Sequence, residues 1–423
     1  MHVISQPLHK TFLLKLYMRF FFLFVILFSF STTEAQDSAV VHEKKLHLFS
    51  GNEQIDLIDV GRYIVNHNTG PRKDTSHIKT GKLHASLLPA LQYTLQTGFE
   101  FSIVGNTEFY TSNEANANSS NIALSVNYTQ KKQFFLPIEG NIWTKGNKYN
   151  VLTDWQFAKF PQDTYGLGGF TTVQDADLID YSYVRLYQTI YKTIAPDFYV
   201  GLGYDLDYYW NVHEINPPAG VITGFQKYGI TPTAISSGLV VSTLYDTRRN
   251  SINPQVGYYG NISYRPNFSL LGSNTNWQSL LFDLRKYNNF PAGSKNVLAF
   301  WSYDWFNVTG KPPYLNLIST GSDTYQNMGR GYEQGRYRGN DLLYLESEYR
   351  FGITPNGLLG AVIFANAQSY AEPDTKRFET ILPGYGAGLR FKLNKFSKTN
   401  IALDYGFGIH GSQGIFANLG EVF

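Results

Sequence analysis

Cysteine, charge and long apolar runs are scarce in this sequence. The 423 residues include no cysteine, a composition that fits a cell-envelope protein without placing it there. Charged residues make up 16%, against roughly 25% in ordinary soluble domains. The mean hydropathy of −0.24 is too low for a bundle of apolar membrane-spanning helices, so that class is excluded.

Sequence motifs for catalysis are also missing. The chain has no H-E-x-x-H, G-x-S-x-G or Walker motif, and its nine histidines are scattered. The stretch GFGIHG at 406–411 matches G-x-G-x-x-G, but alternating residues follow it where a dinucleotide site requires a helix. We therefore expect no enzyme, no cofactor and no metal site. A net charge of +2 gives no reason to invoke nucleic acid as a partner.

Aromatic residues and glycine are abundant instead. The chain contains 31 Tyr, 31 Phe and 38 Gly. From 341 to 351, Leu343 and Leu345 share one parity with other apolar residues, whereas Glu346, Glu348 and Arg350 share the other. A soluble core would not accept three charges on its inner face, but a transmembrane β-barrel has lipid outside and water inside. The tyrosines and tryptophans then form girdles at the two membrane interfaces.

The alternating pattern predicts an all-β fold, an antiparallel transmembrane barrel of sixteen strands. Each predicted strand has about 9 to 14 residues or slightly more, the length that a tilted strand needs to cross a bilayer. The predicted strands are 84–94, 98–110, 120–131, 133–144, 149–160, 178–194, 197–213, 234–246, 255–266, 276–288, 295–308, 340–353, 358–370, 383–394, 400–410 and 413–423. Short turns alternate with long loops at 161–177, 214–233 and 309–339, as in outer-membrane barrels.

Three regions divide the chain. Residues 1–35 read as a signal peptide, with basic residues before an apolar core and Thr33-Glu34-Ala35 as the cleavage site; Met18 is an alternative start. Residues 36–80 are polar and irregular, which predicts a short periplasmic lead-in that holds at most one short helix or strand. Residues 81–423 form the barrel.

Four stretches in the C-terminal half resemble the BamA/TamA-type outer-membrane superfamily, also called the bacterial surface antigen family. They match that family in order and spacing, and together they span about 180 residues: YDTRRNSINPQVGYYGNISYR (245–265), MGRGYEQGRYRGN (328–340), GYGAGLRF (384–391) and ALDYGFG (402–408). The resemblance implies the outer membrane of a Gram-negative bacterium. It also implies sixteen strands, in agreement with the count from alternation.

The resemblance further implies a long loop folded into the lumen. The family's loop motif, V/I-R-G-F/Y, maps onto Gly329, Arg330, Gly331 and Tyr332. The wall motif that receives the loop arginine, F-x-D-x-G, has its best match at 364–368, where Phe364 is kept. Two positions depart from the motif: Asn366 replaces the aspartate and glutamine replaces the glycine.

The chemistry of the guanidinium limits which residues can pair with Arg330. A guanidinium in a partly dehydrated lumen needs a planar hydrogen-bonding partner. Asn366, Glu346 and Glu348 are the candidates, and a carboxylate is favoured because charge-assisted hydrogen bonds are stronger than neutral ones. We expect Arg338 to matter much less than Arg330.

The two ends of the barrel carry further predictions. Closure pairs the first strand with the last, and Pro89 predicts a short or weak seam because it cannot donate a ladder hydrogen bond. Phe423, an aromatic residue after an alternating strand, is the expected C-terminal signal for barrel assembly.

The resemblance implies assistance in inserting or translocating a polypeptide, or a lipid, at the outer membrane. Family members usually carry POTRA domains before the barrel, and a lead-in of about 45 residues is too short for one. The expected partners are therefore outer-membrane lipid, a client polypeptide and a separate periplasmic protein. The alternatives are a passive diffusion pore, a structural surface antigen, or a membrane anchor for a separate partner.

Overall fold

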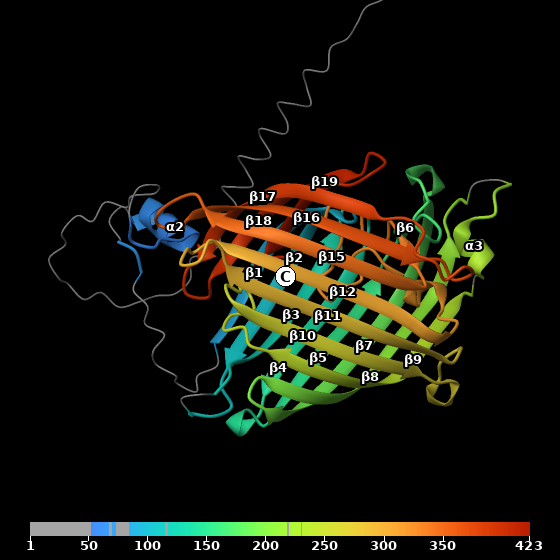
Figure 1. Cartoon of the computed structure of the whole chain (residues 1–423), viewed down its shortest axis with the longest axis horizontal. Helices are drawn as coiled ribbons and strands as arrows, with labels where there is room; N and C mark the ends of the chain where they lie inside the picture. Colours follow the sequence, from blue (N-terminus) through green and yellow to red (C-terminus); the bar gives the residue numbers. More distant parts are fainter. Residues whose placement is uncertain (1–51, 67–69, 73–83, 115–116, 218–219, 230) are drawn as a thin grey trace, which may run out of the picture.

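The computed structural model describes residues 52–66, 70–72, 84–114, 117–217, 220–229 and 231–423. These residues form a nearly closed barrel of sixteen antiparallel strands (Figure 1). The predicted signal peptide and most of the predicted lead-in lie outside the described residues.

The sixteen wall strands confirm the predicted number. Their bounds are β1 His84–Thr94, β2 Gly98–Phe109, β3 Ser120–Thr129, β4 Phe134–Trp143, β5 Tyr149–Lys159, β7 Asp177–Ala195, β8 Phe198–Glu214, β9 Thr233–Asp246, β10 Gly257–Asn267, β11 Trp277–Asn289, β12 Val297–Gly310, β15 Asp341–Gly352, β16 Leu359–Ala371, β17 Leu382–Asn394, β18 Thr399–Phe407 and β19 Gln413–Leu419. Three shorter strands complete the set: β6 Gln162–Thr164 pairs with β7, and β13 Ile318–Ser319 pairs with β14 Arg338–Gly339 inside the barrel.

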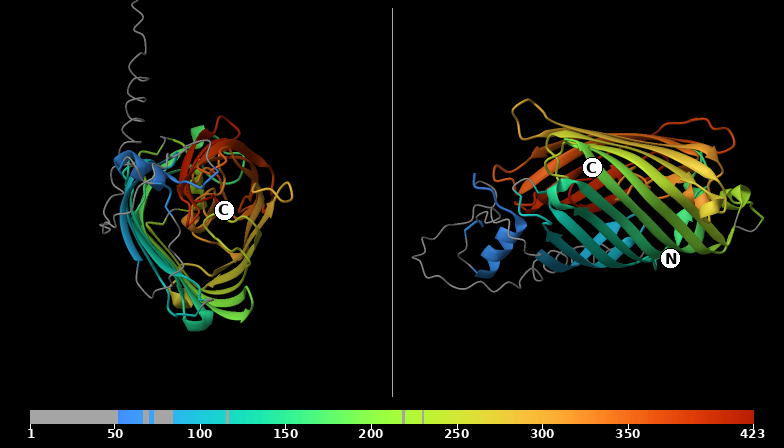
Figure 2. Two further views of the ribbon diagram at one scale, coloured as in Figure 1. Left: turned by 90° about the vertical axis from the view of Figure 1, so that its left-hand side faces the viewer. Right: turned by 90° about the horizontal axis from the view of Figure 1, so that it is seen from below.

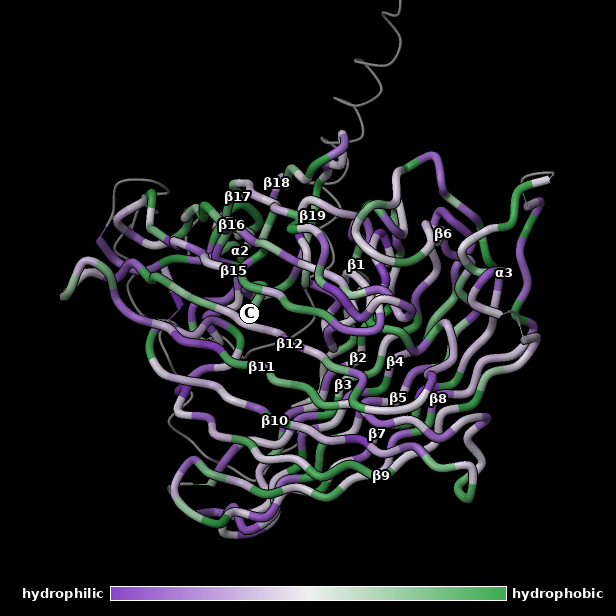
Figure 3. The backbone as a smooth tube through the Cα atoms, turned by 45° about the vertical axis from the view of Figure 1, so that its right-hand side comes forward, coloured by the Kyte–Doolittle hydropathy of each residue, from purple (hydrophilic) through white to green (hydrophobic). Residues whose placement is uncertain are grey.

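Alternation along each wall strand separates two environments. On β15, Leu343 and Leu345 are exposed on the outer face, while Glu346 and Glu348 are buried in the lumen. The same alternation of apolar and polar residues is visible along the strands in Figure 3. A bilayer accepts the outer face, and the inner face keeps its charges away from lipid.

The connections differ between the two ends of the barrel. The linkers of 160–176, 215–232 and 311–340 all lie at one end, which we call the long-loop end. They contain the helix α3 (Gly224–Tyr228) and the 3₁₀ turns η2 (Val173–Asp175) and η4 (Tyr314–Asn316), and η3 (Ser269–Leu271) lies in a shorter hairpin at this end. The opposite, short-turn end carries η1 (Lys145–Asn147) and connections such as 196–197 and 395–398. Among the described residues, no helix is long and apolar enough to cross a membrane.

One helix of the lead-in docks at the short-turn end. The Asp56 carboxylate caps α2 (Leu57–Asn66) by accepting the Asp59 N–H at 2.8 Å. Arg72 pairs with Asp56, and Lys395 on the β17–β18 turn pairs with Asp59 at 2.8 Å. Burial raises the pKa of Asp59, but hydrogen bonds from Lys395 and Arg72 outweigh it and hold this pKa below its usual value. Figure 2 shows the helix beside the barrel mouth.

The seam between the first and last strands is weakly joined. Strands β1 and β19 lie side by side. Among the described strands, β1 is paired with β2 and β19 with β18, but no register pairs β1 with β19. This agrees with the weak seam predicted from Pro89. The prediction that the last strand reaches 423 is wrong, because Gly420 has φ +95° and turns residues 420–423 into the lumen.

Candidate functional site

The loop 311–340 folds into the barrel instead of projecting from it. Its pairing of β13 with β14 forms a small hairpin inside the lumen, and the chain between them runs against the inner wall. Met328, Tyr332 and Tyr337 of this loop are at most 2% exposed and pack with wall residues of β11 to β17. The left view of Figure 2 shows chain crossing the inside of the barrel on this side.

The Arg330 guanidinium lies among three carboxylates of the wall. Its Nε donates to Glu346 Oε1 at 3.0 Å, its Nη1 donates to Asp404 Oδ2 at 2.5 Å, and its Nη2 donates to both Glu346 and Glu348. The side chain is 1% exposed. Breaking such a buried pair by removing one partner typically costs about 3–5 kcal/mol, because the remaining charges lose their counterion. The loop therefore depends on this contact far more than on a surface ion pair.

The wall motif contacts the same arginine in two other ways. The guanidinium carbon lies 3.7 Å from the centre of the Phe364 ring, a cation–π contact. Asn366 Nδ2 donates to the Arg330 carbonyl oxygen at 2.9 Å, so it holds the loop backbone and not the guanidinium. Two of the predicted partners, Glu346 and Glu348, thus contact the guanidinium. The third, Asn366, contacts the carbonyl oxygen of the same arginine instead.

Glycines allow the loop to touch the wall. Gly329 and Gly331 have φ of +84° and +105°, which side-chain-bearing residues rarely adopt. A Cβ on Gly331 would lie 2.7 Å from the Phe407 carbonyl oxygen, and one on Gly406 would lie 2.6 Å from the Gly331 nitrogen. The backbone of the loop therefore packs directly on the backbone of β18.

Tyr332 fixes the loop on the other side of Arg330. Its hydroxyl donates to the Pro383 carbonyl oxygen at 2.5 Å and accepts the Ile409 N–H at 3.0 Å. Its ring meets Tyr337 edge to face at 5.4 Å. A phenol in this position uses both its donor and its acceptor capacity, so it ties β17, the loop and the β18–β19 turn together.

Ion pairs extend the anchor to residues that the sequence argument did not single out as site residues. Arg390 pairs with Asp404 at 2.5 Å and with Glu421 at 2.7 Å, and Arg350 pairs with Glu348 at 2.7 Å. Three arginines thus meet four carboxylates. Along 384–393 and 401–410, Arg390 and Asp404 share the parity opposite the apolar residues, so the lumen-facing parity was the available signal.

Arg338 is also buried, but its partners are neutral. Its Nη1 donates to the carbonyl oxygens of Tyr314 at 3.2 Å and Leu317 at 3.0 Å. No carboxylate lies within salt-bridge distance of it in the described chain. A smaller role than that of Arg330 stays a prediction.

Phe423 lies inside the barrel. Its ring is 5.2 Å from Trp301 and 6.2 Å from Tyr287, and its carbonyl oxygen accepts from Arg350 at 2.8 Å. Val422 accepts from Asn327 of the lumen loop at 2.9 Å. The role of Phe423 as an assembly signal stays a prediction, and in the folded barrel this residue touches the same network as the loop.

The described residues include no group of three or more His, Asp or Glu side chains placed to hold a metal ion. The contacts that the structure shows at this site are charge-assisted hydrogen bonds and backbone packing. They hold one segment of the chain against the wall.

Comparison with known proteins gives structural matches only. No protein-family model and no curated protein sequence matches the chain. The structure is similar to CdiB from Escherichia coli (11% identity, TM-score 0.55, 86% of this chain and 70% of that one). It is also similar to BamA from Haemophilus ducreyi lacking POTRA domains 1–3 (13% identity, TM-score 0.52, 79% and 70%) and to CdiB from Acinetobacter baumannii (12%, 0.50, 80% and 60%). At these identities the likeness shows a shared barrel fold.

Proposed function

We propose that this barrel assists the insertion or translocation of a polypeptide at the outer membrane of a Gram-negative bacterium, without enzymatic chemistry of its own. The observation that carries the proposal is the loop held in the lumen by Arg330 beside a seam that lacks a hydrogen-bonded ladder. The fold shared with BamA and CdiB, and the resemblance of the four sequence stretches, support it.

The seam offers backbone groups to which a strand of a client protein can bind. Unpaired N–H and C=O groups at a strand edge bind another strand by extending the sheet. Inside a bilayer each unpaired backbone group costs several kcal/mol, so an incoming strand that pairs with β1 or β19 is stabilised strongly. In this proposal the short-turn end, which also carries α2, faces the periplasm, and the long loops face outward.

A disulfide across the seam tests the proposal. The chain has no cysteine, so a pair introduced at Leu95 and Gly414 reports on one bond only; a Cβ on Gly414 would lie 2.3 Å from the Leu95 side chain. We expect the oxidised double variant to lose its ability to speed the folding of an unfolded eight-stranded barrel into liposomes. Reduction restores the activity.

The control joins strands that are already paired. Leu91 and Phe101 face each other on the outer side of β1 and β2. A disulfide between cysteines at these two positions leaves the seam free and is expected to leave activity unchanged. Full activity of the oxidised Leu95/Gly414 variant contradicts insertion through the seam.

A passive diffusion pore is the second candidate, because part of the lumen beside the loop is lined by half-buried charged residues of β4, β5 and β10. Single-channel recording of the intact protein distinguishes the two. Small, flickering currents are expected of a barrel with a loop inside. A large, steady current supports the pore.

A further inference from the structure

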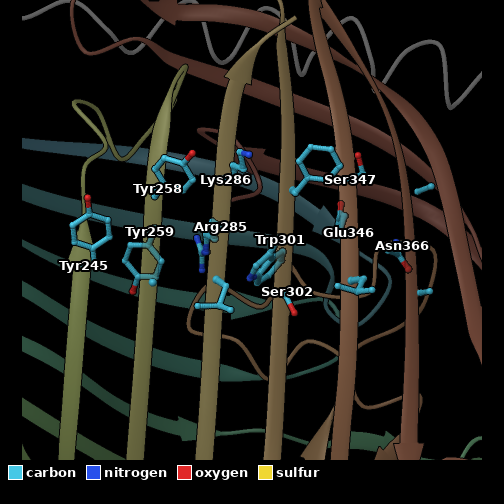
Figure 4. Close-up of a pocket in the computed structure, with 16 residues that line it drawn as sticks. Tyr245, Tyr258, Tyr259, Arg285, Lys286, Trp301, Ser302, Glu346, Ser347 and Asn366 are labelled. Atoms are coloured by element: carbon cyan, nitrogen blue, oxygen red, sulfur yellow. The ribbon is translucent and has the colours of Figure 1, made fainter.

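A groove of about 700 Å³ runs across the outside of the wall from β9 to β16 (Figure 4). This volume lies within the usual range for small-molecule sites, about 300–1,000 Å³. Eleven of its sixteen lining residues have the outward parity; the other five, Trp301 and Glu346 among them, point into the lumen and contribute the floor. The groove therefore opens to the membrane, on the opposite face of the wall from the loop anchor, with which it shares Glu346 and Asn366.

Strand register shows that the groove follows two adjacent rows of side chains. One row crosses all six strands in direct pairing: Tyr245, Gly260, Leu284, Ser302, Leu345 and Ala367. The second row lies beside it: Tyr258, Lys286, Phe300, Ser347 and Ala365. Small residues alternate with large ones in the first row, and the second row changes from large residues to the small Ser347 and Ala365, so larger side chains border the trough that the small residues leave.

The trough has the length and tilt of one lipid chain. Six strands at a spacing of about 4.8 Å make a row of roughly 24 Å. Because the strands of such barrels tilt by about 35–45°, the row descends roughly 15 Å along the membrane normal, half of a hydrocarbon core of about 30 Å. Tyr245 is one residue from the short-turn end of β9, whereas Ala367 is eight residues from the short-turn end of β16. The groove thus begins at the membrane interface and ends near the bilayer centre.

The interfacial end carries a cation. Lys286 is exposed on the outer face, three residues from the end of β11, and its Nζ lies 5.6 Å from the Tyr258 ring centre. In the part of the chain that the structure describes, no carboxylate lies within 4.0 Å of its amine, unlike most arginines of the lumen. A lone lysine beside Tyr258, with Tyr245 one strand further away, suits a lipid phosphate at this depth.

We propose that this groove is a binding site for an anionic glycerophospholipid of the periplasmic leaflet. The phosphate binds Lys286 with the Tyr245 and Tyr258 hydroxyls, and one acyl chain lies in the trough toward Ala365 and Ala367. The inference uses the membrane placement proposed above but not the insertion activity, so lipid binding and insertion succeed or fail separately.

Native mass spectrometry of the full chain with added phosphatidylglycerol or phosphatidylcholine tests the headgroup end. We expect Lys286→Gln to reduce retention of phosphatidylglycerol about fivefold, the effect of roughly 1 kcal/mol per basic residue, and to leave phosphatidylcholine unchanged. The control is Lys192→Gln, which removes an exposed lysine at the same depth on β7. Equal losses in the two variants overturn the headgroup assignment.

Filling the trough tests the acyl end. Ala365→Phe combined with Ala367→Phe is expected to lower retention of both lipids, while Ala387→Phe, at an exposed outward position on the neighbouring strand β17, has no effect. A photoreactive phosphatidylglycerol with a diazirine on its acyl chain should label β12 to β16 in the parent and not in the filled variant. Unchanged retention, unchanged labelling, or a parent dimer that the filled variant abolishes overturns the proposal, the last because the groove then binds a second copy.

Discussion

The two sides of the lumen use the same residue types for different purposes. On the side of β15 to β19, arginine and carboxylates join different segments: Arg330 of the loop meets Glu346, Glu348 and Asp404 of the wall. On the side of β7 to β10, Arg265 pairs with Asp207 at 2.8 Å, and both belong to wall strands. Charges on the first side therefore hold a loop against the wall, whereas the Arg265–Asp207 pair on the second side joins two wall strands.

Burial follows the same division. Arg330, Glu346 and Asp404 are at most 3% exposed, while β4 and β5 keep most of their lumen-facing residues half-buried. Tyr325 at the loop tip is 61% exposed. The loop thus fills the lumen beside β11 to β17 and packs Tyr314 and Leu317 on β7 to β9, but it leaves the lumen face of β4 half-buried; this asymmetry sets the order of the expected effects.

Deletion of 321–338 removes most of the loop from the lumen, and we expect it to have the largest effect of these changes. The lumen then becomes wet on both sides, so the single-channel conductance should rise severalfold over that of the intact protein. Planar bilayer recording measures it. An unchanged conductance would show that the loop does not occupy the lumen in the membrane.

Arg330→Ala leaves buried Glu346 without its cation and removes one of the two cations that Glu348 and Asp404 each contact. We expect a loss of about 3–5 kcal/mol in loop docking, so that protease added outside intact cells cuts between 320 and 338 while the barrel stays folded on a heat-modifiability gel. Arg338→Ala removes hydrogen bonds to neutral carbonyls only and should cost about 1–3 kcal/mol. If the loop of Arg330→Ala resists protease as well as the parent loop does, Arg330 does not anchor the loop.

Gly331→Ala tests the close approach of loop and wall. The added Cβ meets the Phe407 carbonyl oxygen, and the positive φ adds strain, together about 2–4 kcal/mol. Gly357→Ala is the matched control, because Gly357 also has a positive φ, +72°, but nothing lies within 4 Å of its Cβ position. We expect faster proteolysis of the loop in the first variant and not in the second. The same rate in both variants would contradict the close approach of loop and wall.

The smallest expected effect concerns α2, far from both sides of the lumen. The Asp59 pKa is lowered on folding, so its contribution to docking is fully present above the unfolded pKa of about 3.9 and is lost as pH falls through the lower folded value. A spin label on a cysteine at exposed Ile64 should gain mobility as the pH falls through the lowered folded pKa of Asp59. In Asp59→Asn it should be mobile already at pH 7.

Alternation and turn spacing were sufficient to predict the barrel wall. On β15 and β17 the parity of charged and apolar residues gave the lumen face, because a period of two is a local property of the chain. The end of β19 was missed because the inward turn depends on Gly420 and on contacts of Glu421 with Arg390, which join distant segments. The membrane-facing groove was likewise invisible, since it arises only when six strands are set in register.

The anchor was predicted in part. The resemblance and the chemistry of guanidinium directed attention to Arg330, Glu346 and Glu348, and the structure brings all three together. Asp404 was not among the candidate partners, since nothing local shows that β18 lies opposite the loop. Asn366 was one of three candidate partners of the guanidinium, whereas its side chain donates to the carbonyl oxygen of Arg330, a contact that only the folded structure reveals.

Photo-crosslinking from position 332 tests the central claim, that the loop is held inside the barrel, most directly. p-Benzoylphenylalanine in place of Tyr332, activated in intact cells, places a reactive ketone where the Tyr332 hydroxyl contacts Pro383 and Ile409. The account predicts an internal crosslink to the peptides that contain these two residues, lost when Arg330→Ala is added. Crosslinks to other molecules, or none within the chain, would contradict it.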